Sequence, residues 1–311
     1  MPRRRFAPAV VALVRPLRVA MLAVLALTVP LAGCGGSLPP TKPGVVRVVA
    51  AENFWGDIAK QIGGRHVEVT SLISNPNADP HLFESNPQAV AEVAGAQLVI
   101  ANGDGYDEFL SKMLSAGGRH GRLVLTMADQ VPGTAGANPN PHLWYWTSRL
   151  PHFATAIAGY LSRLDSPDRA YFDARARRFV RSLQPLLETI ATIKRKYAGT
   201  PIAYTERVPG YLVAAAGLVV AMPVSFAQAI EDGNDPSPGD VATFDADITD
   251  HRIKVLLYNA QVVDAATTRL EQLAVDAHIP VVGVTETMPA GTTFQAWQLS
   301  QDRDLLRALG G

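Results

Sequence analysis

The chain has 311 residues, 48% of them hydrophobic and 18% charged, and its formal charge at pH 7 is zero. This length is too great for one small core and predicts about two lobes. Five of the 28 basic residues lie among the first 33 positions, which hold no acidic residue, so the remainder carries 23 basic and 28 acidic side chains. A mildly acidic protein argues against nucleic-acid binding, which requires a basic face.

The N-terminal segment has the pattern of an export signal. A basic region is followed by an apolar run at 19–31, shorter than the roughly 20 residues of a spanning helix, and then by Leu31-Ala32-Gly33-Cys34. The small residues before the only cysteine resemble a bacterial lipobox. Residues 1–33 are then a lipoprotein signal peptide, Cys34 carries the lipid, and 34–44 form a flexible tether. The alternatives are a plain anchor or a buried lone thiol; with one cysteine, no disulfide forms within the chain.

Residues 45–149 alternate between strand and helix patterns, which predicts an N-terminal α/β lobe. Such alternation implies a parallel sheet with helices on both faces, and ligands gather at the carboxyl ends of its strands. The strands are expected at 45–50, 67–73, 98–101 and 123–125, and the helices at 54–62, 87–94 and 106–114.

Residues 150–198 are expected to form a connecting helical segment. From Ser166 to Lys196 apolar residues recur at steps of three and four, the period of a helix with one buried face. Pro185 should kink or split this helix, because proline lacks the N–H that a helix interior needs.

Residues 199–311 repeat the alternation and predict a C-terminal α/β lobe. The expected fold is therefore α/β, with two lobes, each a mainly parallel sheet flanked by helices, joined by the long rigid helix. The strands are expected at 202–205, 218–221, 255–258 and 280–284, the helices at 208–216, 241–250, 267–277 and 294–309, and a polar loop at 231–239.

Four residues that follow strand-like runs are candidate metal ligands. Pro76 and Pro80 stiffen the loop that carries His81, and a second prolyl-histidine pair presents His142. Glu206 and Glu286 stand at the ends of expected strands of the second lobe. Two neutral imidazoles and two carboxylates suit a first-row divalent cation and leave the assembly neutral.

Four segments resemble those of the solute-binding lipoproteins of zinc and manganese ABC importers, the cluster A-I family. The resemblance runs in order from about residue 45 to the C-terminus. It implies that His81, His142, Glu206 and Glu286 are the four ligands, in an inter-lobe cleft, and that the ion is delivered to an ABC permease with its cytoplasmic ATPase. The segments are Asn75–Pro87, Asn102–Asp107, Pro141–Trp144 and Tyr204–Glu206.

The resemblance bears on the metal but leaves it open between Mn²⁺ and Zn²⁺. Glu206 stands where many zinc-binding members have histidine, and residues 129–141 hold no histidine, whereas zinc-binding members often have a histidine-rich loop here. Both features favour manganese. Family members often have Asp and Pro soon after the second histidine motif, and here the chain reads Tyr145-Trp146-Thr147.

Three more residues are expected near the site without binding the ion: Asp79 as a support of its loop, and Trp144 and Tyr204 as pocket wall. The expected protein is a lipid-anchored, monomeric receptor on the extracytoplasmic face of the cell membrane, with no enzyme activity. Two alternatives stay open: a receptor for another solute, such as a metal chelate, and a lipid-anchored metallohydrolase. The chain has no His-Glu-x-x-His or Gly-x-Ser-x-Gly motif to favour the latter.

Overall fold

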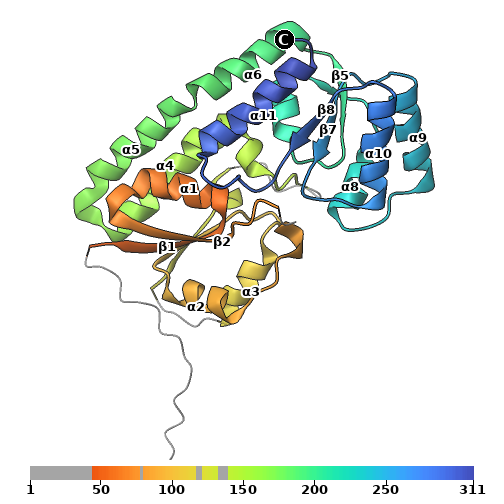
Figure 1. The fold of residues 1–311 in the computed structure, drawn as a ribbon. Helices are drawn as coiled ribbons and strands as arrows, with labels where there is room; N and C mark the ends of the chain where they lie inside the picture. Colours follow the sequence, from red (N-terminus) through yellow and green to blue (C-terminus); the bar gives the residue numbers. More distant parts are fainter. Residues whose placement is uncertain (1–43, 78–79, 117–120, 132–138) are drawn as a thin grey trace, which may run out of the picture. The chain divides into compact units, whose positions relative to one another are not determined.

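The computed structural model describes residues 44–77, 80–116, 121–131 and 139–311, all within one compact unit, Ser37–Gly311. They form two four-stranded parallel sheets, with strand orders β2-β1-β3-β4 and β6-β5-β7-β8. Figure 1 shows β1 and β2 in one half and β5, β7 and β8 in the other, each with helices beside them. The equal orders confirm that the two halves share one plan. The strands are β1 Val46–Glu52, β2 Val67–Ile73, β3 Leu98–Ala101, β4 Leu123–Thr126, β5 Pro201–Tyr204, β6 Val219–Val220, β7 Leu256–Asn259 and β8 Val281–Val284.

Both faces of the first sheet are buried, as the sequence predicts. Alternate β1 residues point to opposite faces. Val48 and Ala50 join the core cluster that includes α1 (Asn53–Gly63) and α4 (Leu150–Leu164). Val49 and Ala51 pack with α2 (Pro87–Gly95) and α3 (Glu108–Ala116).

The second sheet is also covered by helices. The C-terminal helix α11 packs on β8, and α10 packs on β7 and β8. Helix α8 was not expected individually; it begins directly after Pro223 and ends where the polar loop was placed. The helices of this half are α7 Gly210–Ala215, α8 Val224–Glu231, α9 Pro238–Thr249, α10 Ala265–Asp276 and α11 Phe294–Ala308.

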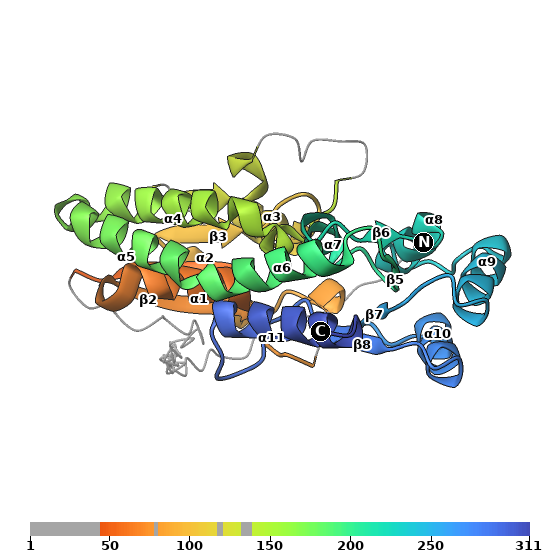
Figure 2. The same cartoon turned by 90° about the horizontal axis from the view of Figure 1, so that it is seen from above.

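The long connecting helix is divided in two, as Pro185 predicts. Helix α5 (Arg169–Ser182) ends just before Leu183, and α6 (Gln184–Tyr197) begins with Pro185 in its first turn, where the missing N–H breaks no helical hydrogen bond. Helix α5 packs on α1 and α4, whereas α6 packs on α11 and α7 (Figure 2). The bent pair therefore connects the helical layers of the two sheets.

Short 3₁₀ turns carry several loops: η1 Gly64–His66, η2 Pro80–Leu82, η3 Ala128–Gln130, η4 Leu143–Tyr145, η5 Thr147–Arg149 and η6 Ser166–Asp168. In the part of the chain that the structure describes, no helix combines the length and apolar character needed to cross a membrane. Cys34 with its tether and Asp79 lie outside the described residues.

Glu52, at the end of β1, is a buried carboxylate whose oxygens have no hydrogen-bond partner among the described residues. Burial and then the charge of Asp107 raise its pKa well above the usual value. A carboxyl group with a raised folded-state pKa stabilises the fold fully only below its unfolded pKa. That contribution is lost as pH rises, by about 1.4 kcal/mol per pH unit up to the folded pKa.

Glu52→Gln is therefore expected to raise the Tm near neutral pH, with a gain that shrinks towards about pH 4. The measurement is thermal unfolding across this range, with Glu68→Gln as the exposed control on the neighbouring strand β2. A gain independent of pH would show that the carboxylate charge is not the cause.

Candidate metal centre

The candidate ligands stand on short segments beyond the strands. His81 lies in η2 after β2, and His142 immediately precedes η4. Glu206 follows β5 by two residues, and Glu286 follows β8 by two residues. Because every strand pairing is parallel, the carboxyl ends of β5 and β8 lie at the same edge of the second sheet.

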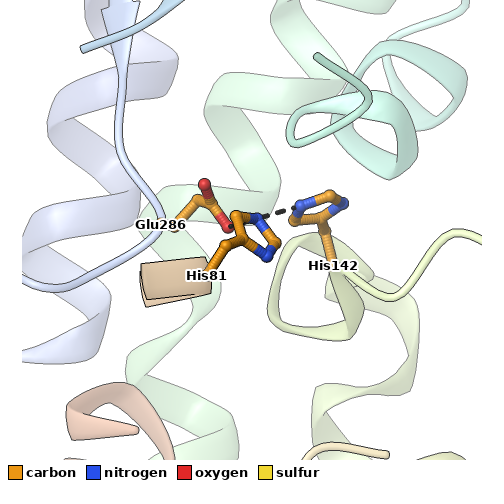
Figure 3. Close-up of side chains that lie close together, drawn as sticks. All are labelled: His81, His142 and Glu286. Atoms are coloured by element: carbon orange, nitrogen blue, oxygen red, sulfur yellow. Dashed lines mark ion pairs between the residues drawn. The ribbon is translucent and has the colours of Figure 1, made fainter. Parts of the chain in front are cut away.

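Three of the four side chains converge. His81, His142 and Glu286 each offer a ligand atom, and these atoms lie within 4.8 Å of one another. Glu286 Oε2 is 3.4 Å from His81 Nε2 and 3.5 Å from His142 Nε2, and both imidazoles lie beside this carboxylate (Figure 3). The side chains of His142 and Glu286 are fully buried, whereas that of His81 is 28% exposed. His81 is therefore the member of this group that solvent reaches.

Glu206 does not belong to that group of three, but it is linked to it through Asn259. The Asn259 Nδ2 group donates to Glu206 Oε2 and, at 2.8 Å, to Glu286 Oε1. Glu206 is 2% exposed, and its other oxygen, Oε1, is buried without a hydrogen-bond partner among the described residues. One amide thus holds the two carboxylates side by side.

The hydrogen bonds of His142 set which ring nitrogen is free. Asn140 Nδ2 donates to the Arg207 carbonyl, so its Oδ1 must be the atom 2.6 Å from His142 Nδ1. An amide oxygen only accepts, so Nδ1 carries the proton and Nε2 of the neutral ring presents a lone pair. Nε2 is buried and has no hydrogen-bond partner in the described chain. This is the tautomer that a metal ligand needs.

The two carboxylates have opposite pKa shifts. Burial raises the pKa of Glu286, but the His142 and His81 imidazoles beside it outweigh burial and hold this pKa below the usual value. Burial and then the charge of Glu286 raise the pKa of Glu206 well above the usual value. Without a cation, Glu286 is therefore the ionised member of the pair and Glu206 holds its proton more tightly.

Contacts between the two halves of the chain support the group. Tyr106, before α3, donates its hydroxyl proton to Glu286 Oε2 at 2.8 Å. Gln261 Oε1 accepts from the backbone N–H groups of Glu286 and Thr287, and its Nε2 donates to the Pro76 carbonyl at 2.9 Å. These bonds fix the Glu286 loop against the segment that leads to His81.

Aromatic rings form the inner wall. The Trp144 ring lies 5.2 Å from the His142 ring and 4.9 Å from the Tyr106 ring, and it stacks on Phe54 at 4.2 Å. Tyr204 is 5% exposed at the end of β5. The apolar wall on the inner side lowers the local dielectric and strengthens electrostatic interactions within the site.

A cavity of about 310 Å³ opens next to the group and includes His81 and Glu206 in its lining. The rest of the lining comes mainly from the α8–α9 loop and the start of α10, including Glu231 and Asp264. Glu231 forms a two-pronged ion pair with Arg207, at 2.6 and 3.1 Å. Solvent thus reaches His81 through an opening whose lining includes acidic residues.

Sequence reasoning missed four residues that shape this centre: Tyr106, Asn140, Asn259 and Gln261. Asn259 is the last residue of β7, so the strand-end rule that selected the two glutamates applied to it as well. Asn140 lies two residues before His142, in the same prolyl-histidine loop. The roles of Tyr106 and Gln261 cannot be read locally, because their contacts join segments far apart in the sequence.

A model of the family described as "ZnuA: Zinc-uptake complex component A periplasmic" matches residues 48–307. The manganese-binding lipoprotein MntA of Bacillus subtilis is 29% identical over 131 residues, 40% of this chain and 42% of the relative. The manganese ABC transporter substrate-binding lipoprotein PsaA of Streptococcus pneumoniae is 25% identical over 168 residues, 50% of this chain and 54% of the relative. The chain thus spans about half, or less, of the length of these curated relatives.

Solved structures extend the likeness of fold to nearly whole chains. The solute-binding protein FpvC of Pseudomonas aeruginosa, in complex with Mn²⁺, has a TM-score of 0.71 and 20% identity over 85% of this chain and 98% of its own. A periplasmic metal-binding protein of Candidatus Liberibacter asiaticus has a TM-score of 0.70 and 18% identity over 85% and 99%. Because the family model covers well over half of the sequence, this chain belongs to the ZnuA family of periplasmic zinc-uptake components.

Proposed function

We propose that this chain captures a divalent transition metal ion, Mn²⁺ or Zn²⁺, outside the cytoplasm and delivers it to an ABC permease. The observation that carries the proposal is the convergence of His81, His142 and Glu286 within 4.8 Å, next to two buried ligand atoms that have no hydrogen-bond partner among the described residues, His142 Nε2 and Glu206 Oε1. Buried polar atoms normally have a partner, and a cation beside Glu286 supplies one for both.

The proposed ligands are His81, His142, Glu206 and Glu286. Two neutral imidazoles and two carboxylates balance the charge of a divalent ion, which lowers the free energy of burying it. Four protein ligands fill a tetrahedral shell, whereas catalytic zinc sites keep a position for water. A coordination shell filled by protein ligands suits an ion that is carried and not used in catalysis, so the proposed protein is a carrier and not an enzyme.

The metal is proposed as Mn²⁺ or Zn²⁺ because the relatives favour Mn²⁺ and the general order of affinities favours Zn²⁺. The relatives MntA and PsaA carry manganese in their names, and Glu206 at the third position favours manganese by family resemblance. The general affinity order places Zn²⁺ above Mn²⁺ at nearly any site of this kind. Affinity in solution therefore needs to be compared with metal content in the cell.

The proposed cellular setting follows from the lipobox-like segment and from relatives named lipoproteins. Residues 1–33 are proposed as the signal peptide, Cys34 as the lipidated residue and 34–44 as the tether. The lobes are proposed as 45–149 and 199–311, with 150–198 connecting them. The partners are a permease and its cytoplasmic ATPase, and the receptor acts as a monomer.

The test is metal stoichiometry. The full chain is purified in detergent without added metal and titrated with Mn²⁺ and with Zn²⁺, and bound ions are counted by elemental analysis. The expected result is that wild type holds one more tightly bound ion per chain than His81→Ala and His142→Ala. No stoichiometric ion with either metal would overturn the proposal.

Metal affinity is expected to fall as pH falls. The raised pKa of Glu206 means that an entering ion displaces a proton from this carboxyl group over a pH range where an ordinary glutamate is already ionised. Below that pKa, affinity then drops by about tenfold per pH unit for each proton that the ion displaces. Kd values measured between about pH 5.5 and 7.5 check this expectation. A flat profile would contradict it.

A receptor for a metal chelate is the second candidate, favoured by the cavity of about 310 Å³ beside His81 and Glu206, which exceeds the volume of a bare ion. The two functions separate in a competition experiment: a bare-ion receptor binds Mn²⁺ or Zn²⁺ less well when a soluble chelator is added. A chelate receptor instead retains the metal together with the chelator.

A further inference from the structure

We propose that the chain has a second divalent-cation site, formed by His66, Asp165 and Asp168 at the opposite end of β2. This site is independent of the proposed import function. His66 ends the η1 turn directly before β2, Asp165 follows α4, and Asp168 closes the η6 turn before α5. The three ligand atoms lie within 4.8 Å of one another. The seven residues of β2 separate this cluster from the His81 loop, a distance of roughly 23 Å at about 3.3 Å per residue.

The spacing of the ligand atoms fits a tetrahedral ion. His66 Nδ1 lies 3.3 Å from Asp165 Oδ2 and 3.2 Å from Asp168 Oδ2. Ligand atoms bound to zinc at about 2.0–2.2 Å are separated by roughly 3.3–3.6 Å in a tetrahedral shell. One imidazole and two carboxylates also neutralise a divalent charge, and they leave a fourth position for water.

His66 cannot donate to both carboxylates through one nitrogen, and its other nitrogen is buried without a hydrogen-bond partner among the described residues. The nitrogen that the two carboxylates face, Nδ1, has at most one proton to donate, and the buried nitrogen is Nε2. The aromatic rings of Tyr171 and Phe172 pack against the imidazole, with centroids 4.7 and 5.7 Å from its own.

Asp168 provides a separate observation. It occupies the N-cap position of α5, where an aspartate side chain normally accepts a backbone N–H bond and stabilises the helix. Its side chain makes no such bond and turns to His66 instead. The Asp168 carboxylate therefore contacts His66 and does not cap helix α5.

Nearby cations do not neutralise the two aspartates within the described chain. The guanidinium groups of Arg65 and Arg175 lie over the Tyr171 ring, at 5.1 and 5.4 Å from its centroid, and Arg175 donates its Nε proton to the Gln61 carbonyl. The ion pairs of Asp165 and Asp168 in the described residues are those with His66. A metal ion bound here would join the α1–β2 turn to the α4–α5 turn and stabilise the first lobe.

The test uses the full chain in detergent, with Zn²⁺ as the probe, at a pH near 7.5 where imidazole is mainly neutral. Equilibrium dialysis followed by elemental analysis counts bound ions in wild type, Glu286→Ala, Asp168→Asn and the double variant. The expected counts are two, one, one and none. Asp173→Asn, a half-buried carboxylate on the same helix α5, is the matched control and keeps both ions.

For variants that fold poorly, the second measurement is thermal unfolding with and without Zn²⁺. In the Glu286→Ala background, Zn²⁺ is expected to raise the Tm, and this rise is expected to vanish when His66→Gln or Asp165→Asn is added. An unchanged ion count in Asp168→Asn, or a Glu286→Ala variant that binds no ion, would overturn the second site and identify the cluster as an ion pair only. Failure of the import site gives a different pattern, in which Glu286→Ala and wild type hold equal numbers of ions.

Discussion

Replacing Glu286 with alanine is expected to weaken metal binding by more than about 100-fold, the upper end of what loss of an outer supporting residue causes. Glu286 lies within 3.5 Å of both imidazoles and accepts hydrogen bonds from Tyr106 and Asn259. Its loss removes a proposed ligand. It also removes a negative charge, because the pKa of the Glu286 carboxyl group is held below its usual value.

The measurement is Mn²⁺ and Zn²⁺ affinity by competition with a chelator of known strength. Glu286→Gln separates charge from shape, because it keeps the size of the side chain and removes the anion; it is expected to lose nearly as much affinity as alanine. The control is Glu84→Ala, an exposed carboxylate in the segment after η2. Wild-type affinity in Glu286→Ala would exclude Glu286 as a ligand.

Replacing Asn259 with leucine is expected to weaken metal binding by about 10- to 100-fold, although Asn259 is not a proposed ligand. Its single amide nitrogen donates to both Glu206 and Glu286, and its Oδ1 accepts the Gln261 backbone N–H. Leucine has a similar size and can do neither. The two buried carboxylates then repel each other with no donor between them, and Glu206 holds its proton still more strongly.

This change has a signature that general destabilisation lacks. Metal binding by the Asn259→Leu variant is expected to depend more steeply on pH, because the ion must displace a proton more often. Gln298→Leu is the matched control: Gln298 is another buried amide, 1% exposed on α11, without a hydrogen bond to any proposed ligand among the described residues. Equal affinity in the folded Asn259→Leu variant and wild type would show that the bridging amide does not position the ligands.

The contacts around Glu286 also explain how an ion would couple the two halves of the chain. His81 and His142 come from the first half, and Glu206 and Glu286 from the second. Tyr106 and Gln261 already join these halves without an ion, through bonds to Glu286 and to Pro76. A bound ion adds bonds from each half to one centre, so unfolding of metal-loaded protein is expected to be more cooperative.

The sequence predicted most of the secondary structure because its signals are local. The strand at Val67–Ile73 and the strand at Leu98–Ala101 have the predicted limits, and the division of the connecting helix follows from Pro185. Helix α8 was missed because its eight residues are too few for the helical period to be distinguished from an apolar run.

The alternating α/β plan of both halves and the four candidate ligands after expected strands were predictable, because periodicity and strand ends can be read along the chain. The folded structure sets which atoms meet. It brings His81, His142 and Glu286 within 4.8 Å, leaves Glu206 outside that group and places Asn259 between the two carboxylates. Such contacts depend on packing between segments far apart in the sequence, as in the 180-residue separation of Tyr106 and Glu286. No local propensity encodes a pairing of this kind, and the same holds for His66 and its two aspartates.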